Sequence, residues 1–463
     1  MACAPVGKTA LGLCFPTVVT MLAVSAASAA ESFFAAGTGS SQPDKTAAAA
    51  AIGIMFPVSA LFQVVSFALG MGAASVISRA LGNEDEDCAE TASVFSFFSA
   101  ISVGIMISLS GCLLIKPLVG VLGASADSSI GIYARRYGSV YMACAPLAIG
   151  ASVLSILLRA RGKALQAAAG ITGGAVLDVL LMHIFVSRLL LGVVGIALAG
   201  LFSQLFAFLT LLLMYIAGNN RRLDVRVFIR SFSLAREIVP LGLPSVIRQG
   251  LTVASAILLN NIAAQISDSA LFSASVSSKV FTLFFGIAIG IGQGISPLIG
   301  FSYGSGNGDR LERAFRLSSV CGSLILLACC GVCLIFPDEM TLLMAHTFSG
   351  KAADGTSRAI MIQCAALPFV QLGIVCNMAY QAAGRKIASS FLAAVRQGVF
   401  YIPLLLVLAR FWGESGLWLA AAASDVLTFV LSVPFSVYFI RKMRKQIRQA
   451  GVNASENPAE AER

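Results

Sequence analysis

GMGAASVISRALG occupies residues 70–82 of the chain, and GQGISPLIGFSYG occupies residues 292–304. Aligned from their first residues, the two stretches share the pattern Gly, Gly, Ile, Gly: Gly70, Gly72, Ile77 and Gly82 against Gly292, Gly294, Ile299 and Gly304. The same spacing carries Pro146 onto Pro368 and Gly162 onto Gly384. Self-similarity at one fixed spacing is the mark of a repeat, so the chain consists of two related halves.

Both halves are strongly apolar. Hydrophobic residues make up 57% of the chain and charged residues only 12%, whereas soluble domains have about 25% charged residues. A helical membrane span takes about 20 apolar residues, and only helices or closed barrels satisfy their backbone in lipid. The long uncharged runs therefore predict an all-α membrane protein with twelve transmembrane helices, at roughly 9–36, 47–80, 91–115, 133–158, 164–187, 192–217, 236–264, 270–302, 312–336, 357–381, 387–410 and 416–440.

The first apolar run has an alternative interpretation as a secretory signal peptide. It follows Lys8 and ends in small residues before Glu31, as signal peptides do. However, LGLCFP at 11–16 has a counterpart in LGLP at 241–244 in the second half. That counterpart favours a permanent span.

Six spans in each half give both halves the same orientation. Such parallel repeats are related by an axis along the membrane normal, so we predict two six-helix bundles related by a pseudo-twofold axis in that direction. The most basic loop, GNNRRLDVRVFIRSFS at 218–233, separates them. The predicted parts are an N-terminal six-helix lobe at 1–217, a cytoplasmic linker at 218–235, a C-terminal six-helix lobe at 236–440 and a cytoplasmic tail at 441–463.

The net charge of +10 is distributed over the loops. Because the basic residues do not form one patch, we expect no nucleic-acid partner. The loops after even-numbered spans, together with both ends, hold most of them, including Arg79, Arg159, Arg161, Arg221, Arg222 and Arg441. The positive-inside rule then places both termini in the cytoplasm of a cell whose plasma (inner) membrane holds the protein.

Parallel repeats in an apolar chain are typical of secondary transporters, whose site lies between the halves. The chain has no GxxxxGK[ST] motif, so ATP is not the expected energy source. The eleven cysteines show no paired spacing, and the histidines are His183 and His346. We therefore expect no metal site. We also expect no catalytic residues and no cofactor apart from a coupling ion, since an intramembrane enzyme needs a nucleophile–base pair or metal ligands.

Several further stretches occur together along the chain. They are NEDED at 83–87 after the first repeat, DRLERAF at 309–315 after the second, GLPSVIRQ at 242–249, RQGVFYIP at 396–403, GLWLA at 416–420 and SDVLT at 424–428. With them the chain resembles, over about residues 8–440, the MATE (multidrug and toxic compound extrusion) transporter family, and most of all its MepA-like bacterial branch. The resemblance implies two six-helix bundles that open as a V and export of organic cations and drugs in exchange for H⁺ or Na⁺. We expect cationic or amphipathic small-molecule substrates and a monomer in the lipid bilayer.

Ionisable side chains inside spans are costly and therefore usually have a partner or a task. Glu31 lies toward the outer end of the first predicted span, where the family commonly has an acidic residue. Asp178 lies in the fifth, where the family usually has asparagine; the family's aspartate four residues later is Met182 here. A carboxylate in apolar surroundings can hold a proton at neutral pH and release it when water arrives, or ligate a cation. We predict Glu31 and Asp178 as the cation-coupling residues. The alternatives are a water-facing carboxylate for Glu31, a structural hydrogen bond for Asp178, and a proton relay through His183.

The second half offers a different set of charges. Asp425 paired with Arg396 or Arg248 would neutralise the lobe interior, and capture of substrate by these groups is the alternative. We predict that this trio forms a charge network. We also predict a substrate cleft, with helix packing as the alternative, that contains Gln63, Gln204, Asn260, Gln293, Asn377 and Tyr380.

The predicted function is cation-coupled multidrug antiport. A lipid-linked oligosaccharide flippase of related architecture is the first rival, and it would favour a more cationic central cleft. An intramembrane enzyme is the second, and only His183 is available in the spans as a base.

Overall fold

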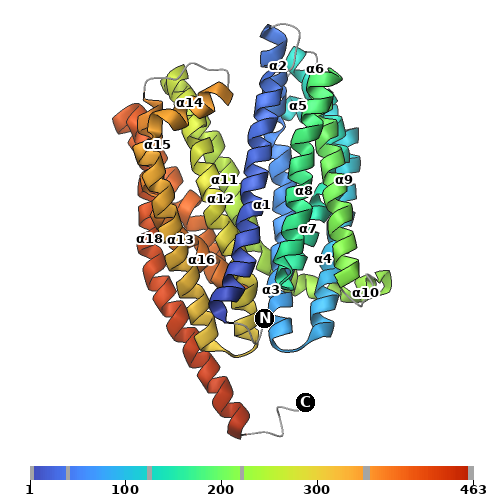
Figure 1. Cartoon of the computed structure of the whole chain (residues 1–463), viewed down its shortest axis with the longest axis vertical. Helices are drawn as coiled ribbons and strands as arrows, with labels where there is room; N and C mark the ends of the chain where they lie inside the picture. Colours follow the sequence, from blue (N-terminus) through green and yellow to red (C-terminus); the bar gives the residue numbers. More distant parts are fainter. Residues whose placement is uncertain (1–4, 38–41, 123–127, 219–223, 348–354, 457–463) are drawn as a thin grey trace.

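The computed structural model describes residues 5–37, 42–122, 128–218, 224–347 and 355–456, and all regular structure in them is helical (Figure 1). The first half contains α1 (Val6–Gly37), α2 (Gln42–Ile54), α3 (Phe56–Gly82), α4 (Glu86–Leu113), α5 (Ile115–Val121), α6 (Ser129–Ala143), α7 (Ala145–Ala160), α8 (Ala164–Met182), the π-helix η1 (His183–Arg188) and α9 (Gly192–Gly218). Then follow α10 (Val225–Arg230), the 3₁₀-helix η2 (Ser231–Leu234), α11 (Ala235–Ile266), α12 (Asp268–Gly304), α13 (Gly308–Ile335), α14 (Pro337–Thr347), α15 (Thr356–Ala365), α16 (Leu367–Ala382), α17 (Lys386–Ala394), the π-helix η3 (Val395–Tyr401) and α18 (Ile402–Glu456).

The described helices accommodate twelve membrane spans. Nine are long and apolar enough by themselves, and two bent pairs raise the number to 11. One of the nine, Lys386–Lys442, is interrupted at Gly413, where φ is 55°. Within it, Arg396 and Asp425 form an ion pair of 2.6 Å although they are 29 residues apart, whereas a straight helix would separate them by about 43 Å. The chain therefore doubles back there, and this segment holds two spans.

Prolines break three spans that the sequence suggested were continuous. The span expected at 47–80 is divided at Met55, just before Pro57. α6 and α7 meet at 49° before Pro146, and α15 and α16 meet at 47° before Pro368. A proline cannot donate the helical hydrogen bond and clashes with the preceding turn. The two bends are nearly equal because their prolines are the repeat partners found in the sequence.

The loops after α3 and α12 repeat one design. The N–H of Asp85 donates to the Ala80 carbonyl at 2.9 Å, and that of Asn307 donates to Ser302 at 2.9 Å. Each of these two side chains then caps the next helix, accepting from Cys88 and Arg310 respectively. Just before each cap the backbone turns left-handed, with φ of 61° at Glu84 and 68° at Gly306. The repeat therefore extends to backbone geometry, although only the second copy uses glycine.

The shared glycines after α7 and α16 serve the same kind of helix end. Gly162 has φ of 82° and Gly384 has φ of 77°. The residue after each glycine donates back to a carbonyl at the helix end, at 2.9 Å in both cases: Lys163 to Leu158, and Arg385 to Tyr380. A left-handed residue with this bond is the Schellman helix end, which favours glycine.

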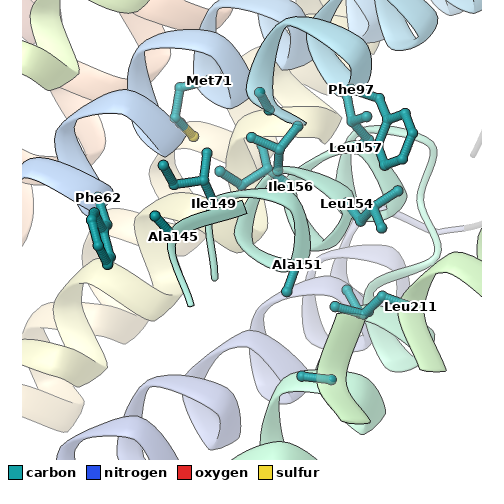
Figure 2. Close-up of a cluster of buried hydrophobic side chains, with 14 of the residues drawn as sticks. Phe62, Met71, Phe97, Ala145, Ile149, Ala151, Leu154, Ile156, Leu157 and Leu211 are labelled. Carbon is teal, nitrogen blue, oxygen red and sulfur yellow. The ribbon is translucent and has the colours of Figure 1, made fainter. Parts of the chain in front are cut away.

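A single helix lies at the centre of each lobe. Most residues of α7 are buried, and Figure 2 shows Ile149, Leu154 and Leu157 among side chains of α3, α4 and α9. α16 is buried to the same degree in the second lobe. Each central helix begins at its bend, so the proline sets the direction in which that helix runs through the lobe core.

The lobes meet along a seam, defined here as the contacts of α1 with α12, α3 with α11 and α3 with α12. The repeat glycines lie in it. A Cβ at Gly72 would collide with the Ile238 carbonyl on α11, and one at Gly294 would lie 2.6 Å from the Cys14 Cα on α1. Gly82 faces Phe301 in the same manner. Glycine permits this approach because it has no Cβ. The contact of α1 with α12 continues along α1 as far as Ser32, which accepts from Lys279 at 2.8 Å, and Figure 1 shows α1 running between the two lobes.

Candidate functional site

A cavity of about 240 Å³ lies where the second lobe meets α1 and α3. We call it the second-lobe cavity, because α11, α12, α16, α17, η3 and α18 supply most of its walls. It brings together six residues predicted from the sequence: Gln63, Arg248, Gln293, Asn377, Arg396 and Asp425. The predicted charge trio and half of the predicted cleft thus line one space.

Arg396 and Asp425 form a two-point ion pair in this cavity. The Arg396 Nε donates to Oδ1 of Asp425 at 2.6 Å, and its Nη2 donates to Oδ2 at 3.4 Å. The guanidinium also lies over the Phe285 ring, 4.4 Å from the ring centre. Arg396 belongs to π-helical η3, and the Ser424 hydroxyl donates to its carbonyl at 2.7 Å. The Asp425 side chain is only 4% exposed, and the Arg396 guanidinium neutralises its charge.

Arg248 has a neutral partner instead. Its Nη1 donates to Oδ1 of Asn377 at 3.0 Å, and the Asn377 amide donates to the Ser389 carbonyl at 2.6 Å. Within the described ranges, no carboxylate lies at salt-bridge distance from Arg248. The cavity therefore carries one arginine charge that no acid among the described residues balances.

Two polar contacts join the lobes at this cavity. The Gln249 Nε2 donates to Gln63 Oε1 at 2.9 Å, linking α11 to α3. The Arg159 Nη1 donates to Gln293 Oε1 at 2.7 Å, linking α7 to α12. Sequence analysis placed Arg159 in a water-facing loop, which is wrong: the residue is 7% exposed. It ends α7 while still inside the bundle, because α7 runs to Ala160.

Glu31 lies in a second polar group, within the first lobe. The Tyr137 hydroxyl donates to its Oε1 at 2.7 Å, and Tyr137 stacks on Tyr141 with ring centres 5.4 Å apart. On the neighbouring Ser32, the hydroxyl accepts a hydrogen bond of 2.8 Å from Lys279 on α12. Glu31 is thus tied to α6 and lies close to a cation of the second lobe.

Asp178 on α8 belongs to the same group. Asp178 lies within electrostatic range of Glu31, on a helix that packs against α1, and it is close to Ser203 on α9. The Ser203 hydroxyl donates to the Gly200 carbonyl at 2.9 Å. The Oδ1 oxygen of the Asp178 carboxylate is buried without a partner among the described residues. We call Glu31, Asp178, Tyr137, Tyr141 and Ser203 the acidic cluster.

Several predicted residues lie elsewhere. Gln204 and Asn260 do not line the second-lobe cavity, and Asn260 is exposed. Tyr380 packs on Phe439 and donates to the Phe435 carbonyl at 3.0 Å. His183 is exposed at the end of α8, its ring 6.4 Å from that of Phe34. The side chain of His346 lies outside the described residues. Across the described ranges, no three His, Cys, Asp or Glu gather as a metal site.

Sequence reasoning missed Tyr137, Tyr141, Arg159 and Gln249. The tyrosines lie on α6, far from Glu31 in the sequence. Only knowledge of which helices pack together would have placed them beside it. Gln249 was quoted as part of a motif, but its neighbour Arg248 was preferred because it carries a charge. No one-dimensional signal distinguishes an arginine that ends a helix inside the bundle from one in a loop.

Comparisons with known proteins agree with this architecture. The MatE family matches residues 16–184 and 244–407, one segment in each half. The multidrug export protein MepA of Staphylococcus haemolyticus (strain JCSC1435) is 25% identical over 402 residues, covering 84% of this chain and 85% of MepA. MepA of Staphylococcus aureus (strain MRSA252) is 23% identical over 393 residues, with the same shares.

Solved structures share the fold. A structure of a multidrug resistance MATE family transporter of the MOP superfamily, in an outward-facing conformation, superimposes with a TM-score of 0.88 at 22% identity. The match covers 96% of this chain and 97% of that one. A MATE structure in a bent conformation has a TM-score of 0.84, covering 96% and 98%. The twelve helices therefore form the two-bundle MATE fold, and since the MatE match extends over most of the chain and over both lobes, the protein belongs to the MatE family.

Proposed function

We propose that the protein exports cationic or amphipathic small molecules, drugs among them, in exchange for H⁺ or Na⁺ that occupies the acidic cluster. The observation that carries this proposal is the meeting of Glu31 and Asp178, from α1 and α8, with one buried carboxylate oxygen left without a partner among the described residues. The names of the MepA relatives, multidrug export proteins, support the export of drugs. No cofactor other than the coupling ion is part of the proposal.

The acidic cluster has the properties that coupling requires. An ion shifts an equilibrium between two conformations only if it binds them differently. Glu31 is on α1, which packs against α8 of its own lobe and α12 of the other. With Glu31 charged, Lys279 of α12 is attracted to α1. A proton or Na⁺ at the cluster weakens that attraction, so ion occupancy biases the contact between lobes.

The cluster and the second-lobe cavity are connected through α1. Ser25 lines the cavity, and Glu31 follows it by six residues, which is about 9 Å along a helix. A displacement of α1 therefore acts on both. This placement lets ion binding in the first lobe change the shape of a substrate site in the second.

Proteoliposomes containing the purified protein and a fluorescent amphipathic dye test the proposal. With Na⁺ and H⁺ gradients imposed separately, wild-type protein should transport dye under at least one of them. Asp178→Asn and Glu31→Gln should lose gradient-driven transport while keeping the wild-type melting temperature. Arg410→Gln, an exposed charge change away from the cluster, is the control. Wild-type rates in both neutral variants would place the coupling elsewhere, with Asp425 next to be tested.

A flippase for lipid-linked oligosaccharides is the second candidate, because the unbalanced Arg248 gives the cavity the positive charge that such a substrate needs. A volume of about 240 Å³ is near the lower end of the ~300–1,000 Å³ of ordinary ligand pockets, which suits a small drug better than an oligosaccharide. Drug export is therefore the better-supported candidate. Transport of a lipid-linked pyrophosphate sugar, with no transport of dye, would reverse this order.

A further inference from the structure

The charges around the second-lobe cavity do not balance. Asp425 is the carboxylate among its lining residues, and Arg396 occupies both of its oxygens. Among the described residues, the partner of the Arg248 guanidinium is the amide oxygen of Asn377. Behind the wall, Arg159 is buried against Gln293. Charges in surroundings of low dielectric constant act strongly on one another, so the cavity has a positive potential that favours an anion.

The neutral lining groups add hydrogen-bond donors. The oxygen of Gln293 accepts from Arg159, and the oxygen of Gln63 accepts from Gln249. Both side chains are left with amide N–H groups to offer. Gln249 donates through its amide nitrogen, so its carbonyl oxygen remains as an acceptor. Donors from Arg248, Gln63 and Gln293 therefore predominate in a cavity whose one carboxylate is already paired.

The rest of the lining is apolar. Met21, Phe67, Phe285 and Ile289 supply hydrocarbon and ring surface on the walls. Ligand pockets combine such surface with a few placed polar groups that fix orientation. A ligand that suits this cavity has a flat apolar body and one anionic end.

We propose that the second-lobe cavity binds amphipathic carboxylates, with the carboxylate on the Arg248 guanidinium and the apolar body between α1, α3 and α12. The inference rests on the proposed function, since it names one class of the exported substrates. The Asn377–Ser389 hydrogen bond orients Asn377, which in turn holds the Arg248 fork. A guanidinium held in this way can offer a carboxylate two parallel hydrogen bonds.

A matched pair of ligands tests this inference in purified protein in a neutral detergent. Fluorescence anisotropy gives the Kd of 7-diethylaminocoumarin-3-carboxylate and of its methyl ester, which differ in charge but little in shape. We expect the carboxylate to bind at least about tenfold more tightly, the usual effect of a charge-assisted hydrogen bond. Arg248→Gln should weaken carboxylate binding about ten- to hundredfold and change ester binding less than about twofold.

Arg248→Lys keeps the charge but loses the fork, so its carboxylate Kd should lie between those of wild type and Arg248→Gln. Arg410→Gln removes an exposed arginine charge outside the cavity and should leave both Kd values unchanged. If the ester binds as tightly as the carboxylate, or if Arg248→Gln leaves the preference intact in protein with a wild-type melting temperature, the inference is wrong. Binding requires no ion gradient. Failure here with intact gradient-driven dye export would therefore overturn the inference alone, and loss of coupling with intact binding would overturn the coupling proposal alone.

Discussion

Gly294→Ala should open the seam between the lobes. A Cβ at this position would lie 2.6 Å from the Cys14 Cα and 2.8 Å from the Leu13 carbonyl oxygen, whereas ordinary contacts begin at 3.4 Å. Because both neighbours are backbone atoms of α1, they cannot rotate away. α1 and α12 must therefore separate by about 0.8 Å, the difference between 2.6 Å and 3.4 Å.

Overpacking of this kind costs about 1–3 kcal/mol. The cost falls only on a conformation in which the seam is closed, so it moves the equilibrium toward an open seam by about 5- to 150-fold. Cys14 reports the change directly, since its thiol donates to the Ile291 carbonyl across the seam at 3.5 Å. In protein whose other cysteines are replaced, N-ethylmaleimide should label Cys14 faster in the Gly294→Ala variant than in wild type.

Gly12→Ala is the matched control, because it lies two residues from Cys14 and its added Cβ would meet no atom within 4 Å. It also controls for the higher helix propensity of alanine. Equal labelling rates for wild type and Gly294→Ala, together with equal melting temperatures, would refute the view that the repeat glycines hold the lobes together.

Three further predictions follow from other parts of the structure. Glu84→Gly should raise the melting temperature, because a left-handed residue other than glycine costs about 1–2 kcal/mol. Gly306→Ala at the equivalent place should lower the melting temperature for the same reason. The opposite shifts would show that the left-handed backbone does not set the stability of these two loops. Arg396→Gln should cost about 3–5 kcal/mol because it leaves the Asp425 carboxylate buried without a countercharge. Arg396→Met with Asp425→Leu should cost much less in the same thermal unfolding measurement. Equal losses would mean that the ion pair is not what stabilises this contact. For topology, Ser269→Cys should react with an impermeant maleimide from outside intact cells and Ser305→Cys only after permeabilisation, as expected if both termini are cytoplasmic; the opposite result would invert the predicted orientation.

The number and type of helices were predictable because they depend on composition along the chain. Apolar runs and the repeated glycines and prolines locate the twelve spans and relate the halves. The bends at Pro146 and Pro368 were uncertain, since a membrane helix can also absorb a proline without a break. Their equal angles emerge only when the structure is compared with the repeat.

The candidate site was only partly predictable because lining a cavity depends on the direction of a side chain around its helix. Asn377 and Tyr380 are three residues apart on α16, yet the first lines the second-lobe cavity and the second packs on Phe439. Asn260 lies on α11, as Arg248 does, but it lies three turns further along and is exposed. Residue type predicts that a side chain is polar, while helix rotation and helix pairing decide what it meets.

The unbalanced arginine of the second-lobe cavity has an electrical consequence for the transport cycle. A charge that crosses a whole membrane field changes in energy by about 2.3 kcal/mol per 100 mV. In the proposed exchange, the protein crosses in one direction with an anionic substrate in the cavity and in the other with the coupling cation but without substrate. The charge of Arg248 is then neutralised in the first direction and left unbalanced in the second. Under this proposal, membrane voltage acts differently on the two directions of the cycle, and the resting potential of the cell helps to set how quickly the cavity becomes available again.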